Sequence, residues 1–301
     1  MSARSARLLL GSCPDSWGVW FADDPLQTPW SRFLDELASV GYQYLELGPY
    51  GYLPTDPVRL ADEVGQRGLT VAGHSGLHKP GDFDSILAAT REVASLTGAL
   101  GAKHVIFVPV PGYRDDVTGE YLEPAELDVD GWRTMIAAAN EIGRQISEDF
   151  GVRLQFHPHA DSHVMTQPQV ERFLGDTDPR YVSLCLDTGH LAYGRADSVA
   201  IIRSFPSRIG YVHIKQMDPD IVAKAEAEDL AFGQAVAMGA SVEPPAGLPD
   251  IPSVLAALEE LDAELFTVVE QDMYPCDFGK PRPIAERTFQ YLTSHGVEDS
   301  A

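Results

Sequence analysis

Four residues of metal-binding type stand at the ends of short apolar runs in the second half of the chain. These runs and their polar residues are RLQFH with His157, SLCLD with Asp187, YVHI with His213 and TVVE with Glu270. Imidazole and carboxylate groups together are ligands for divalent Mn, Co, Zn or Fe. One such histidine alone would more often be a hydrogen-bonded polar side chain. Burying four such groups without a partner would cost several kcal/mol, which a cation offsets, so the pattern predicts a divalent-metal site.

A second tier of polar residues follows these candidates and comprises His159, Lys215, Asp272 and His190. The first three each lie two residues beyond a candidate ligand, and side chains two residues apart in a strand point the same way. Histidine has a suitable ordinary pKa for moving protons near neutral pH, so His159 and His190 are the predicted acid–base groups, with Glu270 as a third candidate. Lys215 is predicted to hold a substrate hydroxyl or a developing oxyanion. Asp272 either contacts substrate or caps a helix.

Three residues of the first half are predicted to face the same site from the other side. Glu46 ends the run QYLEL and either contacts substrate or orients a metal ligand. His74 follows the run LTVAG. Trp17 belongs to the segment CPDSWGVW, and its ring either stacks on the apolar face of a sugar or packs within the rim. The predicted substrate contacts are therefore Trp17, Glu46, His74, Lys215 and Asp272.

The apolar runs that carry these residues recur along the whole chain. Each holds five to seven residues rich in Val, Ile, Leu and Phe, which is typical of parallel strands buried on both faces. They are 7–11, 43–47, 69–73, 103–109, 152–157, 182–187, 209–214 and 265–270. Amphipathic segments with helical periodicity lie between or after them, at 30–40, 57–66, 83–100, 131–149, 167–175, 197–204, 251–261 and 282–293.

Eight strands that alternate with helices predict a closed (β/α)8 barrel, an α/β fold that forms a single domain over residues 1–301. The alternative, an open doubly wound sheet, is disfavoured because no strand-to-helix turn carries a GxGxxG phosphate-binding motif. Active sites of such barrels lie at the carboxyl ends of the strands, where the polar residues above are expected. The long stretch 215–250 is predicted to be an active-site loop after the seventh strand.

Composition and charge narrow the range of partners. The chain has 301 residues and a net charge of −23 with no basic stripe, which argues against nucleic acid. No stretch approaches the roughly 20 apolar residues of a membrane span, and the N-terminal apolar run is too short for a secretion signal. Three cysteines without CxxC spacing are typical of a reducing compartment, so a cytoplasmic enzyme with a small-molecule substrate is expected. The sequence leaves open whether the chain forms a homodimer.

The motifs PDSWGVW, FHPH, DTGH, VHIK and VVEQD resemble those of the xylose-isomerase-like TIM-barrel superfamily, and most closely its inosose dehydratase branch. The resemblance extends over nearly the whole chain. It implies a metal site with one residue from each of the last four strands, matching His157, Asp187, His213 and Glu270. It also implies a sugar, keto-sugar or keto-cyclitol substrate and a role in carbohydrate metabolism such as inositol catabolism. Manganese or cobalt is the expected metal, with zinc and iron as alternatives.

The reaction that this resemblance implies is loss of water next to the carbonyl of a keto-cyclitol such as 2-keto-myo-inositol, through an enolate. A base removes the α-proton, and an acid protonates the departing hydroxyl. Sugar 3-epimerases of the superfamily usually carry Glu on the fifth strand and use two metal-bound glutamates, whereas this chain has His157 there. The alternatives are a sugar isomerase or keto-sugar 3-epimerase, and a lyase that acts on 3-keto-glycosides. Whether His157 binds the metal or acts catalytically stays open.

Overall fold

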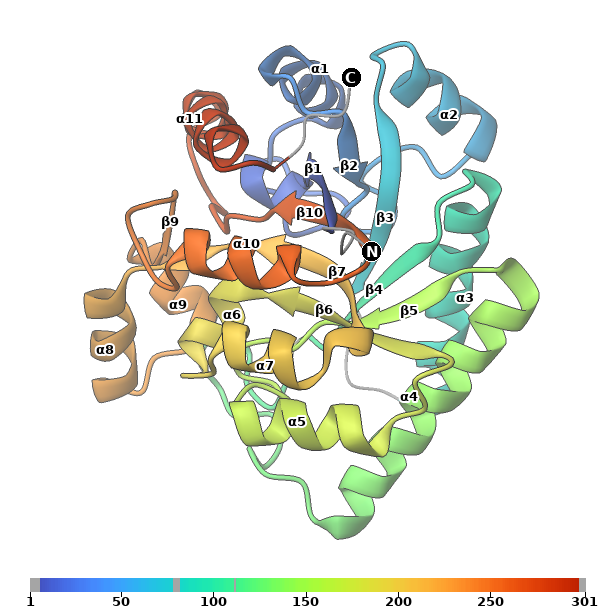
Figure 1. The fold of residues 1–301 in the computed structure, drawn as a ribbon, viewed down its shortest axis with the longest axis vertical. Helices are drawn as coiled ribbons and strands as arrows, with labels where there is room; N and C mark the ends of the chain where they lie inside the picture. The colour runs from blue at the N-terminus through green and yellow to red at the C-terminus, as the bar shows by residue number, and fades with distance from the viewer. Residues whose placement is uncertain (1–5, 78–81, 111, 298–301) are drawn as a thin grey trace.

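Eight parallel strands close into a barrel at the centre of the molecule (Figure 1). The computed structural model describes residues 6–77, 82–110 and 112–297. The barrel strands are β1 (Arg7–Ser12), β2 (Tyr44–Glu46), β3 (Thr70–Leu77), β4 (His104–Val108), β5 (Arg153–Phe156), β6 (Val182–Asp187), β7 (Ile209–Ile214) and β10 (Glu264–Val269). The ring closes because β1 pairs with both β2 and β10. The predicted (β/α)8 barrel is thus confirmed, and an open sheet is excluded.

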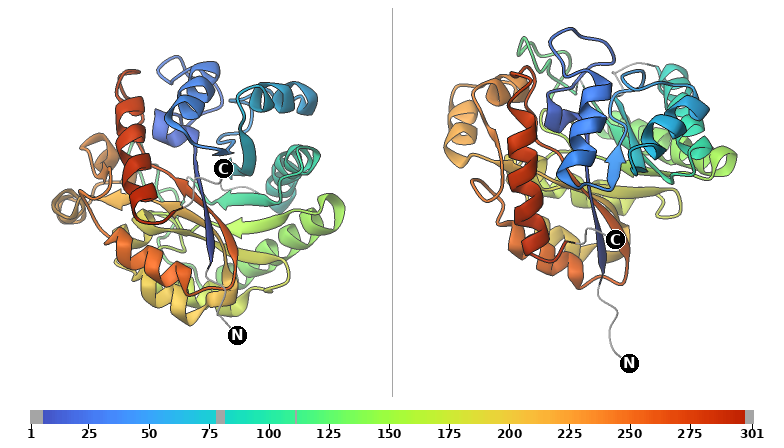
Figure 2. Two further views of the ribbon diagram at one scale, coloured as in Figure 1. Left: turned by 45° about the horizontal axis from the view of Figure 1, so that its top comes forward. Right: turned by 90° about the horizontal axis from the view of Figure 1, so that it is seen from above.

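A layer of helices surrounds the barrel. These helices are α1 (Trp30–Val40), α2 (Pro57–Gly65), α3 (Phe83–Ala99), α4 (Val129–Phe150), α5 (Gln167–Asp176), α6 (Thr188–Tyr193), α7 (Ser198–Ser204), α10 (Ile251–Glu259) and α11 (Pro281–Ser294). Aspartates cap several of them, as where Asp128 accepts the backbone N–H of Gly131 at the start of α4. The last helix, α11, lies beside α1 (Figure 2). No helix within the described residues is long and apolar enough to cross a membrane.

Two layers of apolar side chains support the barrel. The larger layer fills the space between strands and helices, and it includes the fully buried Leu45 and Leu184. A smaller cluster contains Cys185 of β6 and Tyr211 of β7. Because side chains two residues apart in a strand share a face, Asp187 and His213 lie on the same face as these two residues and nearer the carboxyl ends of the strands. Polar groups at the barrel mouth thus stand above an apolar floor.

The stretch 215–250, predicted as one long loop, is a folded insertion after β7. It contains α8 (Pro219–Ala227), α9 (Phe232–Ala237) and a small antiparallel sheet of β8 (Gln216–Met217) and β9 (Ser241–Val242). The insertion has a buried cluster of its own, which includes Met217, Ala225 and Phe232. A segment packed in this way can hold one wall of a site in a fixed position.

The predicted strand bounds agree with the structure to within one residue except at β3. That strand was expected to end at residue 73, but it continues to Leu77. The register between β2 and β3 shifts between Leu45 and Glu46, where Leu45 pairs with Val71 and Glu46 with Gly73. The shift and the extra length change which side chains of β3 reach the barrel mouth.

Candidate metal centre and active-site cavity

Asp187 is held in place by the helix that it starts. It ends β6, and its Oδ1 accepts the backbone N–H of His190 at 2.7 Å, which caps the first turn of α6. This bond leaves Oδ2 to face two other candidate ligands, 3.3 Å from His157 Nε2 and 3.7 Å from His213 Nδ1. One residue therefore serves as both a helix cap and a candidate metal ligand.

His213 is oriented by a carboxylate from the other half of the barrel. It lies on β7, and its Nε2 is hydrogen-bonded to Glu46 Oε2 on β2 at 2.9 Å. Its other ring nitrogen, Nδ1, contacts Glu270 Oε2 just past the end of β10. A carboxylate behind a metal-binding histidine commonly fixes the ring's tautomer in this way. Of the two alternatives for Glu46, this hydrogen bond supports the orienting role.

The four predicted ligands come together at the barrel mouth. One ligand atom from each lies within 4.8 Å of the others, and the residues are the buried His157, Asp187, His213 and Glu270. Among the described residues, His213 Nδ1 and Glu270 Oε2 face each other as an ion pair, and neither atom has a further hydrogen-bond partner in the site. Buried polar atoms seldom go unpaired, and two imidazoles with two carboxylates suit a first-row divalent metal. The donor set therefore fits a divalent cation.

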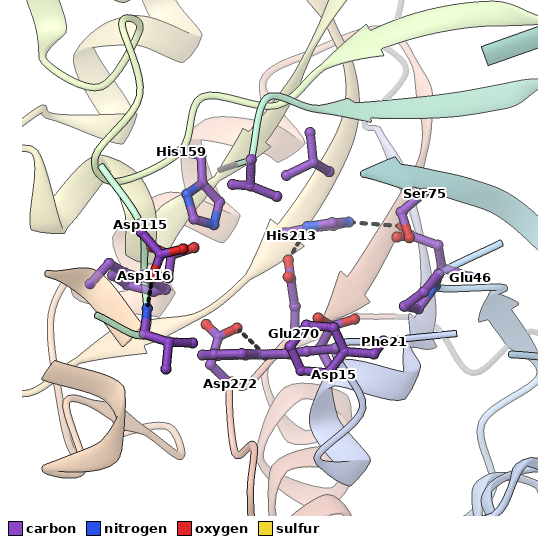
Figure 3. Close-up of a pocket in the computed structure, with 16 residues that line it drawn as sticks. Asp15, Phe21, Glu46, Ser75, Asp115, Asp116, His159, His213, Glu270 and Asp272 are labelled. Atoms are coloured by element: carbon purple, nitrogen blue, oxygen red, sulfur yellow. Dashed lines mark hydrogen bonds and ion pairs between the residues drawn. The ribbon is translucent and has the colours of Figure 1, made fainter. Parts of the chain in front are cut away.

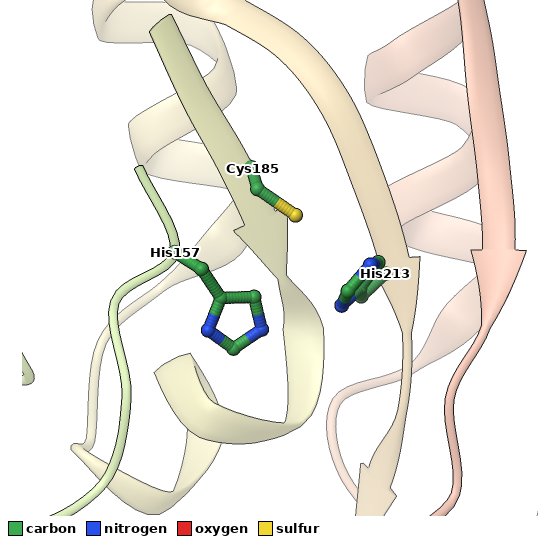
Figure 4. Close-up of side chains that lie close together, drawn as sticks. All are labelled: His157, Cys185 and His213. Carbon is green, nitrogen blue, oxygen red and sulfur yellow. The ribbon is translucent and has the colours of Figure 1, made fainter. Parts of the chain in front are cut away.

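Cys185 offers a second donor set one layer below the first. Its Sγ and a nitrogen of both His157 and His213 lie within 4.8 Å of one another (Figure 4). A thiol must lose its proton to bind a metal. Burial raises the pKa of Cys185 to about 12. The first set has four ligand atoms against three here, and lowered pKa values keep its carboxylates Asp187 and Glu270 ionised, so it is the better metal site.

Lys215 is enclosed among carboxylates behind the candidate ligands. Its fully buried Nζ lies 2.7 Å from Asp272 Oδ2, 3.3 Å from Glu270 Oε1 and 3.5 Å from Asp187 Oδ2. Burial alone would lower the pKa of Lys215, but these carboxylates raise it well above its ordinary value, so the lysine stays charged. Conversely, burial would raise the pKa of Asp187, and Lys215 helps to hold it well below its ordinary value. Lys215 does not line the cavity, so its position supports charge balance more than the predicted substrate contact.

The two histidines predicted as acid–base groups differ in how their ring nitrogens are occupied. His190 Nδ1 accepts the Ala160 N–H at 3.2 Å, and its Nε2 lies 3.0 Å from Lys215 Nζ. His159 Nδ1 lies 2.7 Å from the Ala160 carbonyl oxygen, so it carries a ring proton and donates it. Burial lowers the pKa of His159 to about 3, which keeps the ring neutral and leaves Nε2 unprotonated, but also makes it a weaker base than a free imidazole. His159 also lines the cavity, so it is the better placed of the two to accept a proton from substrate.

A cavity of about 380 Å³ opens at this end of the barrel (Figure 3). His213 and Glu270 lie centrally in this view, with Asp116 to one side and Glu46 to the other. Apolar surface comes from Trp20, Phe21, Val108, Val110 and Phe232. Two of the predicted substrate contacts, Glu46 and Asp272, line the cavity. Asp272 pairs with Lys215 rather than capping a helix.

The structure does not bring Trp17 to this cavity. Trp17 is fully buried against Phe33, with ring centroids 5.0 Å apart, and its indole N–H donates to Glu36 of α1 at 2.9 Å. Trp20 lines the cavity instead, and its Nε1 donates to Asp272 Oδ1 at 3.3 Å. The 3-10 turn η1 (Pro14–Trp17) directs the first tryptophan into the core, and the sequence alone did not distinguish the two.

His74 likewise lies outside the cavity lining, because β3 runs on past the point where it was expected to end. The next residue, Ser75, lines the cavity, and successive side chains of a strand point to opposite faces. His74 stacks on Tyr50, with ring centroids 5.8 Å apart. Burial lowers the pKa of His74 to about 3, so it is a neutral packed side chain.

Several cavity residues were not anticipated from the sequence. Asp15 follows β1, and its carboxylate lies within 4.8 Å of those of Glu270 and Asp272. Burial and these two carboxylates raise the pKa of Asp15 well above its ordinary value. Its position after a strand end was a usable signal. Asp116 and Phe232 come from long connections, and only tertiary packing reveals that they meet here.

Comparison with known proteins places this barrel in a family. The sequence matches the family model described as xylose isomerase-like TIM barrel over residues 34–295. The chain belongs to the xylose isomerase-like TIM barrel family. This membership agrees with the resemblance seen in the sequence motifs and with the closed barrel that carries the site.

Two sequence relatives and one solved structure align with most of the chain. An inosose dehydratase of Clostridium botulinum (strain Alaska E43 / Type E3) is 26% identical over 296 residues, which cover 96% of this chain and 97% of the relative. A rhizopine catabolism protein, MocC, of Rhizobium meliloti is 30% identical over 264 residues, covering 85% and 80% of the two chains. The structure of the IolI protein with a bound zinc atom shares the fold, with a TM-score of 0.71, 17% identity and coverage of 96% and 97%. The chain is an enzyme of the carbohydrate lyase or isomerase type.

Proposed function

We propose that this protein is a divalent-metal-dependent dehydratase that removes water next to the carbonyl of a keto-cyclitol such as 2-keto-myo-inositol. The observation that carries the proposal is a buried set of two imidazoles and two carboxylates within 4.8 Å of one another, beside a cavity that His159 also lines. The likeness to an inosose dehydratase over 96% of the chain supports the substrate class.

The metal would be held by His157 Nε2, Asp187 Oδ2, His213 Nδ1 and Glu270 Oε2, the atoms that face one another in this site. Mn²⁺ or Co²⁺ is proposed, with Zn²⁺ and Fe²⁺ as alternatives, and the bound ion would act as a Lewis acid toward the substrate carbonyl. Glu46 keeps the His213 ring oriented through its hydrogen bond to Nε2. Lys215 offsets part of the negative charge of the carboxylates around it.

His159 is the proposed proton carrier. Its Nδ1–H is tied to the Ala160 carbonyl, so Nε2 is the nitrogen available to take the proton from the carbon next to the carbonyl. The same proton then passes to the hydroxyl on the following carbon, the C–O bond breaks, and water leaves as a carbon–carbon double bond forms. The neighbouring Phe232 ring, centred 5.2 Å from that of His159, helps to keep bulk water from this proton.

The test is an absorbance assay of Mn- or Co-loaded protein with 2-keto-myo-inositol, following the conjugated dione product. We expect metal-dependent turnover that is lost in Asp187→Ala. The matched control is Asp197→Ala, because Asp197 also caps a short helix, α7, but lies outside the site. A lost cap costs about 1 kcal/mol in each variant, so only the ligand loss should abolish turnover.

The same assay separates the proposal from its alternatives. A sugar isomerase or 3-epimerase would interconvert sugars without releasing a conjugated product, and a lyase of 3-keto-glycosides would release a free sugar or aglycone. His157 stands where a two-glutamate epimerase would need a carboxylate, which weighs against the epimerase. No absorbance change from metal-loaded protein would refute the keto-cyclitol dehydratase.

A further inference from the structure

The loop that follows β4 forms one side of the cavity, and it is anchored to the insertion after β7. Arg114 of this loop is buried, and its guanidinium donates to the carboxylate and the carbonyl oxygen of Asp229. Its Nε also donates to the carbonyl oxygen of Gly119 at 2.9 Å, which ties the loop to itself. Gly233 of α9 packs so closely on the Asp116 carbonyl that a side chain there would collide with it. These contacts hold Asp116 in a defined position.

Asp116 presents to the cavity a carboxyl group that no cationic side chain among the described residues pairs with. Within the part of the chain that the structure describes, its buried Oδ1 has no hydrogen-bond partner. Burial, with help from Asp161 and Asp272, raises the pKa of Asp116 to about 7, so the group is a charged carboxylate only above that pH. A hydrogen-bond donor that reached this oxygen would relieve the unpaired acceptor. Asp116 lines the same cavity as His213 and Glu270, and Figure 3 shows it on the side of Glu270 opposite to Glu46. A ring seated over the metal ligands can therefore direct a substituent toward Asp116.

The cavity as a whole is acidic. Six of its lining residues are Asp or Glu, and none of its described lining residues is Lys or Arg. Lys215, behind the wall, is already paired with Asp272 and Glu270. A single bound divalent ion would neutralise only part of this charge. Phosphate and carboxylate groups are usually held by the bidentate guanidinium of Arg or by Lys, and this cavity offers neither to a substituent that points away from the metal.

We infer that Asp116 is a specificity-determining residue, which accepts a hydrogen bond from a hydroxyl or ammonium group on the substrate ring, and that the cavity excludes phosphorylated and carboxylated rings. The inference rests on the proposed function for the identity of the ring, but not for the reaction performed on it. Val108, Val110 and Phe232 offer apolar surface to the C–H faces of a ring, which leaves the carboxylates to its substituents.

The test is calorimetric binding, at about pH 8.5 where Asp116 is ionised, of three unreactive rings to metal-loaded protein. The rings are myo-inositol, an inosamine with one amine in place of a hydroxyl, and myo-inositol monophosphate. Wild-type protein should bind the monophosphate at least about 100-fold more weakly than myo-inositol, because like charges meet in the cavity. Asp116→Asn should weaken myo-inositol about fivefold and the inosamine more, since a hydrogen bond to a charged acceptor is stronger than one to a neutral amide. The same variant should bind the monophosphate more tightly than wild type does. Glu120→Gln, which removes one charge from an exposed position of the same loop, is the matched control and should behave as wild type.

Opposite shifts for the neutral and phosphorylated rings cannot come from a variant that merely folds poorly. Equal effects on all three rings, no effect of Asp116→Asn, or no myo-inositol binding by wild type would overturn the inference. Steady-state kinetics on the ketone add a second readout, in which Asp116→Asn should raise KM and leave kcat within about threefold. If wild-type protein binds the rings in the expected order but does not dehydrate the ketone, the dehydratase proposal fails while this inference stands.

Discussion

In the two halves of the barrel, the buried histidines His74 on β3 and His213 on β7 lie in opposite electrostatic surroundings. On β3 and β4, burial lowers the pKa of His74 to about 3 and that of His104 to about 4. On β7, burial also acts to lower the pKa of His213, but nearby acidic groups that include Glu270 raise it well above its ordinary value. The pKa of His157 on the neighbouring part of the barrel is also raised above its ordinary value. Burial alone thus makes a neutral core histidine, and only adjacent carboxylates make a site that attracts a cation.

The difference between the two halves follows from which residues face each other on neighbouring strands. In the second half, β6 and β7 pair with Asp187 opposite His213, so a carboxylate and an imidazole meet side by side. In the first half, His74 pairs with Val105, and His104 Nδ1 is hydrogen-bonded to the amide of Gln155. The first half therefore provides packing, orientation of His213 through Glu46 and part of the cavity wall. The second half provides all four candidate metal ligands.

The largest effect expected from this difference is on turnover. His159→Gln should lower kcat by about 10²–10⁴-fold, the usual worth of a general acid–base group, while metal content stays unchanged. His74→Gln should leave kcat within a few-fold, because His74 packs on Tyr50 away from the cavity. Steady-state assays with measured metal content check both variants. Equal losses in the two variants would break the distinction between the halves.

The next effect is on metal affinity. His157→Ala should weaken binding of Mn²⁺ or Co²⁺ by at least about 100-fold, since even outer partners of a metal ligand are worth 10- to 100-fold. His104→Ala should leave the affinity unchanged. Titration of metal-free protein by calorimetry measures both. Unaltered affinity in His157→Ala would instead assign His157 a catalytic role, with three protein ligands at the metal.

A smaller effect is expected on stability at low pH. The pKa of His104 is about 4 in the folded protein and about 6.5 when unfolded, so its contribution is present above pH 6.5 and is lost as the pH falls toward 4. Between pH 7 and pH 4.5 this loss amounts to about 2–3 kcal/mol in the free energy of unfolding. Urea unfolding should show that the free energy of unfolding of wild type falls between pH 7 and pH 4.5. In His104→Gln the fall should be smaller by this amount. A drop of the same size in both proteins would contradict the assignment.

The smallest effect is expected on KM, from Trp20 in the part of the cavity wall that the first half of the barrel forms. Trp20→Phe removes the hydrogen bond from the indole to Asp272 and should raise KM about two- to fivefold. Trp17→Phe should leave KM unchanged and lower only the melting temperature, because the Trp17 ring is buried and its N–H bonds Glu36. Kinetics and thermal melts of the pair check the point. A raised KM for Trp17→Phe would contradict this assignment and indicate that Trp17 contacts the substrate.

How far the sequence predicts this molecule can be traced in particular residues. The runs at 182–187 and 209–214 coincide with β6 and β7, because unbroken apolar strands leave little choice of bounds and of the polar residue at the end. His74 was misplaced because β3 is longer than its apolar run and its register to β2 shifts. Asp116 lies in a loop whose position depends on Arg114 and Asp229, which are far apart in sequence, so no local pattern could reveal it.

The closure of the barrel by β1 also bears on the order in which the chain can fold. Arg7 at the start of β1 meets Glu264 of β10, so one of the two partners of the first strand is made 257 residues later. During synthesis β1 can pair with β2, but its other edge must wait for nearly the whole chain to emerge. Contacts between such distant segments slow folding, and an open strand edge invites pairing with other chains. The protein is therefore most vulnerable to aggregation in the interval before its last strand arrives.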